Sequence, residues 1–398
     1  METYDLDNFE PAAKIIVIGV GGGGNNAVNR MVASGMKGIE FVSINTDRQQ
    51  LAKSKGPSLQ IGERITKGQG CGSDPEKGKK SAEESRDDIM ALIGDTDILF
   101  ITAGMGGGTG TGAAPVVAGI AKEMGVLTIG VVTRPFMFEG TRRQRQADQG
   151  IEELRQKVDS LIVIPNERIK YVTEQKVTFL NAFSCADEVL RQAVQSIADL
   201  ITIPGLVNLD FADVKTILSE AGFAHMGVGF ASGKNKASEA ASKAIQSPLL
   251  ETSIRGATRV LINIMGSPDM GLEEIDSAAS TVERAVDSNA DIIFGAIIDD
   301  KLDDEMKVTI IATGFESEGK NPLEVETVAQ TGVLVQPKSE PTSGPIPVFS
   351  SPIDFVPITE TVKTDVPETV KEPVNQEKGL GDDDDDPYND IMKIFEIK

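Results

Sequence analysis

Histidine and cysteine are nearly absent from this sequence. The 398 residues include one histidine, His225, and two cysteines, Cys71 and Cys185. One histidine argues against a histidine-based metal cluster and against a Ser-His-Asp triad. Two cysteines are too few for a disulfide framework. These shortages exclude several common classes of enzyme and of disulfide-held domain.

Long apolar runs are also missing. No stretch approaches the roughly 18 uninterrupted apolar residues that indicate a membrane-spanning helix. The first residues, METYDLDNFEPAAK, are acidic and lack the basic start and apolar centre of a signal peptide. We therefore expect a cytoplasmic protein with no direct membrane insertion.

Positive charge is scarce. The chain has 39 lysines and arginines against 61 acidic residues, a formal net charge of −22. This balance disfavours nonspecific attraction to nucleic acid or anionic lipid, so no nucleic-acid partner is expected. Residues 316–390 carry 17 acidic residues and 5 lysines, so the rest of the chain is only mildly acidic.

Apolar runs alternate with amphipathic stretches from residue 14 onward. Nearly continuous apolar strands separated by helices predict an α/β fold, a doubly wound parallel sheet covered on both faces. Ligands of such a domain lie at the carboxyl ends of the strands, near the switch point. The expected strands are 14–19, 39–45, 97–103, 126–132 and 160–166.

A long central helix and a second domain follow. Five apolar residues at helical spacing predict one buried face over 178–202: Phe183, Leu190, Val194, Ile197 and Ile201. Further strands near 225–232, 257–266, 290–299 and 306–314, with helices near 235–246 and 272–287, predict a second, smaller α/β domain with a mixed sheet.

The predicted organisation therefore has six parts. Proline and charge prevent a packed core after residue 315, and a group of apolar residues from Ile391 to Ile397 follows five aspartates near the C-terminus. The parts are a disordered N-terminal segment at 1–10, the first α/β domain at 11–177, the central helix at 178–202, the second domain at 203–315, a disordered acidic linker at 316–386 and a partner-binding peptide at 387–398.

Two glycine-rich loops each connect a strand to a helix. The first is GVGGGGNN, at 19–26, and the second is AGMGGGTGTGAAP, at 103–115, with six glycines in thirteen positions. Each glycine inside a regular element costs roughly 0.5–1 kcal/mol relative to alanine, so these loops need positive φ angles or a close approach to bare backbone.

Neither loop contains the G-K-[ST] of a P-loop. Phosphates held there would depend on main-chain N–H groups and on the N-terminal ends of two helices, with Thr109 and Thr111 adding hydroxyl donors. Two loops that converge on one crevice fit a ligand with several phosphates better than a dinucleotide.

A nicotinamide-dependent oxidoreductase is the alternative interpretation. Gly19, Gly21 and Gly24 satisfy G-x-G-x-x-G, and Asp47 lies near the position of a ribose-binding acid. A nicotinamide fold needs one such fingerprint, whereas this chain has two glycine loops.

Three motifs carry a family resemblance. GGGTGTG at 106–112 resembles the signature of the tubulin/FtsZ superfamily, and RPFMFEG at 134–140 and NLDFADV at 208–214 resemble FtsZ specifically. The resemblance runs from about 14 to 315 and includes the acidic linker and terminal peptide. It implies a GTP-binding and GTP-hydrolysing cytoskeletal protein that polymerises head-to-tail into filaments of the cell-division ring, with domain 11–177 binding GTP and 203–315 activating it.

The resemblance also implies site residues and partners. GTP or GDP would be the ligand, with Mg²⁺ and no assigned protein ligand for it. Membrane-anchor and regulatory division proteins would bind the C-terminal peptide. The implied nucleotide contacts are Gly21, Gly22, Gly23, Gly24, Asn25, Gly106, Gly107, Gly108, Thr109 and Gly110 at the phosphates, Glu139 and Arg143 at the ribose and triphosphate, and Asn166, Phe183 and Asp187 at guanine.

Hydrolysis needs a positioned water, and the candidate catalytic residues are Asn208, Asp210 and Asp213. From the residues alone, a helix N-cap is the favoured interpretation of Asp210. A span of 16 residues on one helix separates Asp187 from Ile203, about 24 Å at 1.5 Å per residue. The acids are therefore expected to serve the nucleotide of the next subunit in a head-to-tail filament.

Two positions depart from the family pattern. In GQGCGSDP at 68–75, which resembles a third glycine loop, Cys71 stands where alanine is usual, and we interpret it as neutral packing rather than as a redox site. The terminal NDIMKIFEIK lacks the proline usual between its isoleucine and phenylalanine. A scaffold without hydrolysis is disfavoured because Asp210 and Asp213 are both present.

Overall fold

The computed structural model describes residues 13–171, 177–179, 181–202, 210–247, 254–299 and 302–315. The segments predicted to be disordered, the terminal peptide and the candidate catalytic Asn208 lie outside these described residues.

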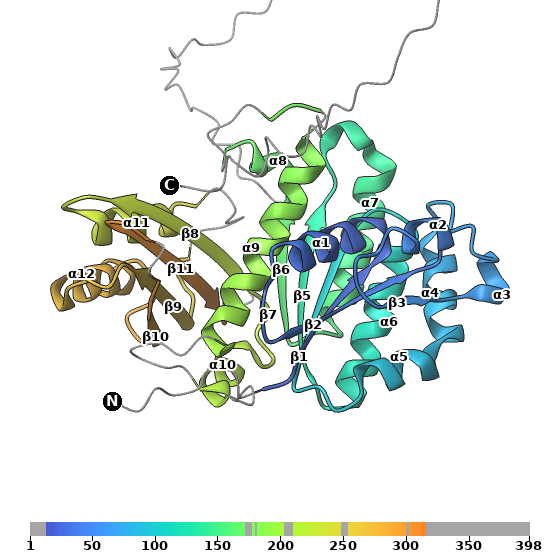
Figure 1. The fold of residues 1–398 in the computed structure, drawn as a ribbon, viewed down its shortest axis with the longest axis horizontal. Helices are drawn as coiled ribbons and strands as arrows, with labels where there is room; N and C mark the ends of the chain where they lie inside the picture. Colours follow the sequence, from blue (N-terminus) through green and yellow to red (C-terminus); the bar gives the residue numbers. More distant parts are fainter. Residues whose placement is uncertain are drawn as a thin grey trace, which may run out of the picture. The chain divides into compact units, whose positions relative to one another are not determined.

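Seven strands form the first sheet, and every neighbouring pair is parallel (Figure 1). Their spatial order is β3-β2-β1-β4-β5-β6-β7. The strands are β1 (Ile15–Val20), β2 (Ile39–Asn45), β3 (Ser58–Gln60), β4 (Ile98–Gly104), β5 (Leu127–Arg134), β6 (Ser160–Pro165) and β7 (Gly222–Phe223). The predicted parallel sheet is confirmed, and β3 and β7 are additions too short to appear as apolar runs.

Helices cover both faces of this sheet. Successive strand residues point to opposite sides, so Ile15 and Val17 join the core under α1 and α9, whereas Ile16 and Ile18 join the core under α5, α6 and α7. The helices of this domain are α1 (Gly21–Ala33), α2 (Arg48–Leu51), α3 (Glu63–Thr66), α4 (Pro75–Glu84), α5 (Arg86–Ile93), α6 (Thr109–Glu123), η2 (Met137–Glu139), α7 (Thr141–Arg155) and α8 (Asn166–Ile169).

The long helix α9 (Ala182–Thr202) packs against both domains. Leu190, Val194 and Ile197 are buried, and their core also contains Leu261 and Ile311 of the second sheet. One hydrophobic core therefore extends from the first sheet through α9 to the second sheet.

Phe183 does not lie on the buried face of α9 as the spacing predicted, because it is 43% exposed. It stands in the first turn, beyond the core.

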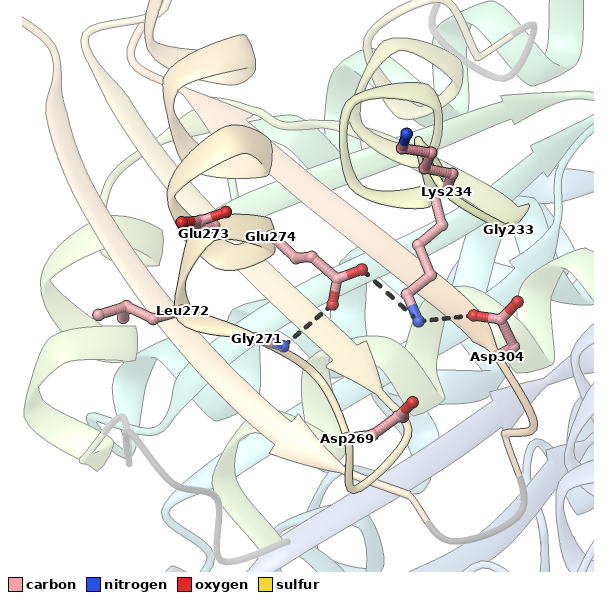
Figure 2. A pocket seen from close by; sticks show the side chains of 9 residues that line it. Gly233, Lys234, Asp269, Gly271, Leu272, Glu273, Glu274 and Asp304 are labelled. Carbon is pink, nitrogen blue, oxygen red and sulfur yellow. Dashed lines mark hydrogen bonds and ion pairs between the residues drawn. The ribbon is translucent and has the colours of Figure 1, made fainter.

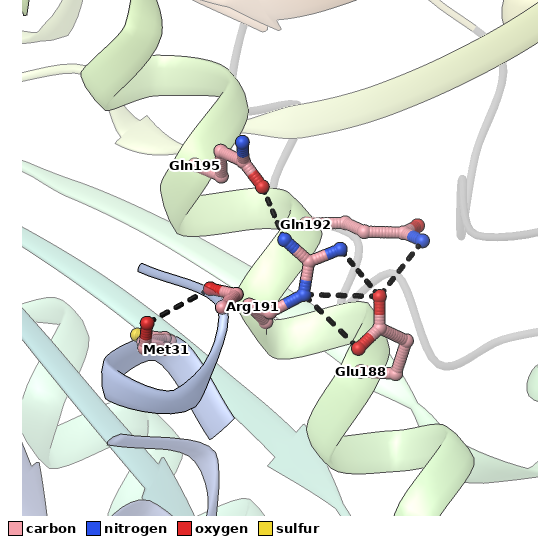
Figure 3. A network of polar contacts seen from close by, with 6 residues as sticks. Met31, Glu188, Arg191, Gln192 and Gln195 are labelled. Carbon is pink, nitrogen blue, oxygen red and sulfur yellow. Dashed lines mark hydrogen bonds and ion pairs between the residues drawn. The ribbon is translucent and has the colours of Figure 1, made fainter. Parts of the chain in front are cut away.

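Farther along α9, Glu188 accepts hydrogen bonds from Arg191 at 3.0 Å, within a row of polar side chains that reaches Gln195 (Figure 3).

The second domain contains a mixed sheet in the order β10-β9-β11-β8. β9 (Arg259–Gly266) and β10 (Asp291–Ile298) are parallel, whereas β11 (Glu305–Thr313) is antiparallel to β9 and to β8 (His225–Ser232). Its helices are α10 (Phe211–Leu218), α11 (Lys236–Ile245) and α12 (Leu272–Glu283). This confirms the predicted second α/β domain. None of the helices in the described part of the chain combines the length and apolar character of a membrane span.

One contact of α6 gives a stability prediction. A Cβ at Gly112 would stand 1.9 Å from the carbonyl oxygen of Pro75 in α4, whereas a Cβ at Gly119 would meet only Lys157 Cδ, at 3.8 Å. Gly112→Ala should destabilise the fold by about 2 kcal/mol or more because the backbone of α4 must move. Gly119→Ala, the control on the same helix, should stabilise it by up to about 1 kcal/mol through helix propensity. Urea unfolding measures both, and equal effects would contradict this packing.

Candidate functional site

The two glycine loops lie side by side. They follow β1 and β4, which are hydrogen-bonded neighbours at the centre of the first sheet. The chain runs outward from β1 to β2 and β3 on one side, and from β4 to β5 and β6 on the other. The loops therefore occupy the switch point of the sheet, as predicted.

The two loops pack backbone against backbone because the glycines at the contact have no side chains. Gly21 has a φ of +72°, and a Cβ there would stand 2.7 Å from the amide nitrogen of Gly110. A Cβ at Gly23 would stand 3.2 Å from Cα of Gly104. These glycines are required because the two backbones touch, a role separate from contact with any ligand.

Other glycines face open space. Nothing lies within 4 Å of a Cβ built at Gly22, and a Cβ at Gly107 would meet only Nη2 of Arg143, at 3.9 Å. Helices α1 and α6 begin in these loops, at Gly21 and Thr109. The first N–H groups of a helix have no partner within the helix and carry positive partial charge, so two such ends at one edge suit a ligand with several phosphates.

Thr111 differs from its predicted role. It is buried, and its hydroxyl accepts a hydrogen bond from the Gly106 N–H at 2.8 Å. The hydroxyl thus braces the second loop from inside and is not an open donor.

Asn25 also braces a loop. It is 3% exposed, and in the amide orientation that satisfies its surroundings it donates to the carbonyl oxygens of Gly19 (2.8 Å) and Gly21 (2.9 Å) and accepts from Nδ2 of Asn45 (3.1 Å). The sequence analysis missed Asn45 and its neighbour Thr46. Polar residues directly after a buried strand are the signal that would have found them.

Glu139 and Arg143 form an ion pair of 2.6 Å between Oε2 and Nη1, with the Glu139 side chain 7% exposed. The other carboxylate oxygen of Glu139 accepts from the Phe136 N–H at 2.9 Å. The pair fixes the start of α7. This part of α7 lies against the second glycine loop, since a Cβ at Gly106 would stand 2.7 Å from the carbonyl oxygen of Arg143.

A side-chain amide oxygen without a hydrogen-bond partner follows β6, and an exposed aromatic ring stands at the start of α9. Asn166 is 5% exposed, and its Oδ1 has no hydrogen-bond partner among the described residues. The ring of Phe183 packs edge-on against Phe136 at 5.6 Å and Phe138 at 6.3 Å. A buried acceptor without a donor is costly, so a ligand N–H would be stabilised there.

Asp187 is the buried acid of this region. Burial raises its pKa to about 7, although the guanidinium of Arg30, 3.6 Å away, favours the ionised form. The ion pair does not offset the loss of hydration. A ligand that donates hydrogen bonds to the carboxylate would favour ionisation.

The candidate catalytic acids lie elsewhere. Asp210 caps α10 by accepting from the Asp213 N–H at 2.8 Å, and Asp213 accepts from the Asp210 N–H at 3.3 Å. The N-cap interpretation is therefore confirmed as a local role.

The position of α10 separates these acids from the glycine loops. Ser160, the first residue of β6, donates to the carbonyl oxygen of Leu218 in α10 at 2.7 Å. Asn166 follows the other end of β6, about 20 Å away along a six-residue strand. Figure 1 shows α10 at the end of α9 opposite α8. The last residue of α10 thus contacts the amino edge of the sheet, and Asp210 and Asp213 stand at the first turn of the same short helix.

A cavity of about 570 Å³ in the second domain is a different feature (Figure 2). Its lining is charged, and the buried ammonium of Lys236 lies 2.9 Å from Asp304 and 3.6 Å from Glu274. These ion pairs tie α11, α12 and the link before β11 together, so Lys236 already has two acidic partners within the protein.

The pKa of Asp187 gives a pH prediction for the protein without ligand. The folded state holds the Asp187 proton more tightly than the unfolded chain does. Protonation of Asp187 therefore adds to the free energy of unfolding at low pH, and this contribution is lost as pH rises through about 7. Asp187→Asn removes the titration, so the unfolding free energy of the variant should gain about 2–3 kcal/mol on that of the wild type between about pH 5 and 8. Denaturant unfolding across this range measures it, and a constant offset between the two proteins would contradict it.

Comparisons with known proteins agree with this architecture. Residues 14–174 match the model of the Tubulin/FtsZ family, GTPase domain, and residues 222–316 match the FtsZ family, C-terminal domain. An empty FtsZ dimer from M. jannaschii is 46% identical, with a TM-score of 0.73, covering 77% of this chain and 89% of that one.

Two structures from Haloferax volcanii share the fold at lower identity. The CetZ2 protofilament with bound GTPγS is 20% identical over 76% of this chain and 94% of that one, and the CetZ1 monomer with bound GDP is 23% identical over 75% and 93%. The TM-score is 0.65 for each. The family models and the M. jannaschii relative show that this chain belongs to the FtsZ family of tubulin-like GTPases.

Proposed function

We propose that this GTPase polymerises head-to-tail into filaments of a cell-division ring, and that each active centre is completed by Asp210 and Asp213 of the adjacent subunit. One observation carries the proposal. The glycine loops lie at the carboxyl edge of the sheet, whereas α10, which Asp210 caps, contacts its amino edge through Ser160. Stacking subunits edge to edge would bring one copy's acids to the other copy's nucleotide.

The nucleotide would lie along the carboxyl edge of the first sheet. Its phosphates would contact the bare backbone at Gly22 and Gly107 and the hydroxyl of Thr109. Its guanine would donate N–H groups to Asp187 and to the unsatisfied Oδ1 of Asn166, as the resemblance implies. The exposed ring of Phe183 offers a stacking surface.

Mg²⁺ would accompany the triphosphate. In the part of the chain that the structure describes, no three histidine, cysteine or acidic side chains group as a metal site. The ion would therefore be held mainly by phosphate oxygens and water, which is common for Mg²⁺. It would neutralise phosphate charge.

The acids would orient the attacking water. Each uses one carboxylate oxygen in the cap of α10, at 2.8 and 3.3 Å. This reciprocal arrangement fixes both side chains and leaves the second oxygen of each to accept a hydrogen bond from water. Residue 208, the third candidate, lies outside the described residues.

Self-association of relatives supports assembly. The M. jannaschii FtsZ structure is a dimer, and the CetZ2 structure is a protofilament with GTPγS. We also propose, from the resemblance, that the terminal peptide at 387–398 binds membrane-anchor and regulatory division proteins, placing the filament at the division site.

The nicotinamide alternative is weakened because its expected ribose ligand has a structural role. Asp47, its expected ribose ligand, caps α2 by accepting from the N–H groups of Gln49 (2.8 Å) and Gln50 (3.3 Å). Light scattering and phosphate release with added GTP, GDP or NAD separate the two interpretations.

A mixing experiment tests the shared site. Asp213→Ala should bind GTP but lose at least about 100-fold in turnover, because the water loses its orienting group. Gly107→Val should fold, since nothing but Arg143 lies near its Cβ, but should block phosphate binding. Each variant alone should be inactive, whereas a mixture should hydrolyse GTP, because one supplies nucleotide and the other supplies the acid. A mixture as inactive as its parts would contradict the proposal.

A further inference from the structure

Three loops meet in a buried polar cluster at the carboxyl end of β2. We call it the Thr46 cluster, and its members are Thr46, Cys71 and Thr109. The hydroxyls of Thr46 and Thr109 are 2.7 Å apart, and the thiol of Cys71 lies 3.3 Å from the first and 3.5 Å from the second. Thr46 is fully buried and Cys71 is 5% exposed. The cluster joins the residue after β2, the 68–75 loop and the second glycine loop.

The main chain holds Thr46 in place. Its N–H donates to Oδ1 of Asn45 at 2.9 Å, and its carbonyl oxygen accepts from the Gly70 N–H and the Thr66 hydroxyl, each at 3.2 Å. Asn45 in turn donates to Asn25, which braces the first glycine loop. These bonds connect Thr46 to the first glycine loop and to the 68–75 loop, and its hydroxyl reaches the second glycine loop.

The proton count of the cluster determines what Thr109 offers. A hydroxyl has one proton to donate and two lone pairs to accept with. Two hydroxyls 2.7 Å apart share one proton between them, so one of them keeps a proton free for another acceptor. Thr46 is fully buried, whereas Thr109 is partly exposed and begins α6 in the second glycine loop. Only on Thr109 can this free hydroxyl proton reach a ligand, because Thr46 is fully buried.

We propose that Thr46 is a positioning residue, whose hydroxyl donates to Oγ1 of Thr109 and so leaves the Thr109 proton for a nucleotide phosphate. The proposal rests on the proposed function. Without nucleotide, the Thr109 proton goes to the Cys71 thiol, a weak acceptor at 3.5 Å. A charged phosphate oxygen is a much stronger acceptor and takes the proton from the sulfur. Cys71 thus holds the Thr109 hydroxyl until a phosphate binds.

Titration of GTP onto the full-length protein tests this. Thr46→Val should weaken binding about three- to tenfold, the value of one hydrogen bond, whereas Thr46→Ser should stay within about twofold of the wild type. Thr46→Val combined with Thr109→Val should bind no more weakly than Thr109→Val alone, because Thr46 acts through Thr109. Cys71→Ala should not weaken binding.

A matched control separates positioning from general damage to the fold. Thr128→Val removes another buried strand hydroxyl, which donates to the Val126 carbonyl oxygen at 2.9 Å near the start of β5, and it should leave GTP affinity unchanged. Unchanged affinity in Thr46→Val, equal losses in Thr46→Val and Thr46→Ser, additive losses in the double variant or weaker binding in Cys71→Ala would each overturn the inference alone. A wild-type protein that binds no GTP would overturn the proposed function, and this inference with it.

Discussion

The structure depends on a backbone-to-backbone contact between two loops on neighbouring parallel strands. The loop after β1 and the loop after β4 approach so closely that a Cβ on Gly21 would reach within 2.7 Å of the Gly110 nitrogen. A side chain at that contact would push the loops apart and turn the starts of α1 and α6 away from each other. The glycines that make the contact are therefore distinct from Gly22 and Gly107, which leave bare backbone facing open space.

The carboxyl edge of the sheet also holds groups that the fold alone does not satisfy. Oδ1 of Asn166 has no partner in the described part of the chain, and burial raises the pKa of Asp187 to about 7. Both costs are relieved by a ligand that presents N–H donors, as guanine does on the proposed function. The site thus gives up folding stability in exchange for selective binding.

The sequence predicted the parts of this protein that depend on local pattern. Apolar runs located five strands of the first sheet, and paired glycine loops located the switch point. The dipeptide strand β7 carries no such pattern, because its place in the sheet comes from pairing with β6. The exposure of Phe183 was missed because spacing on a helix shows a face but not where the core ends. The role of Thr46 was missed because its partner Thr109 lies 63 residues away along the chain, and the link from Asn25 to Asn45 was missed because it depends on β1 pairing with β2. The caps at Asp47 and Asp210 are local, and the second was readable from the residues.

Distance across the sheet then connects fold to function. The glycine loops lie at the carboxyl edge of the first sheet, whereas α10, which Asp210 caps, contacts the amino edge, so the loops and α10 of one subunit lie at opposite ends of the strands. Turnover per subunit, measured as the protein is diluted, tests this most directly. Specific GTPase activity should fall toward zero below the concentration at which assembly ceases, while GTP remains bound. A specific activity that stays constant through that dilution would contradict it.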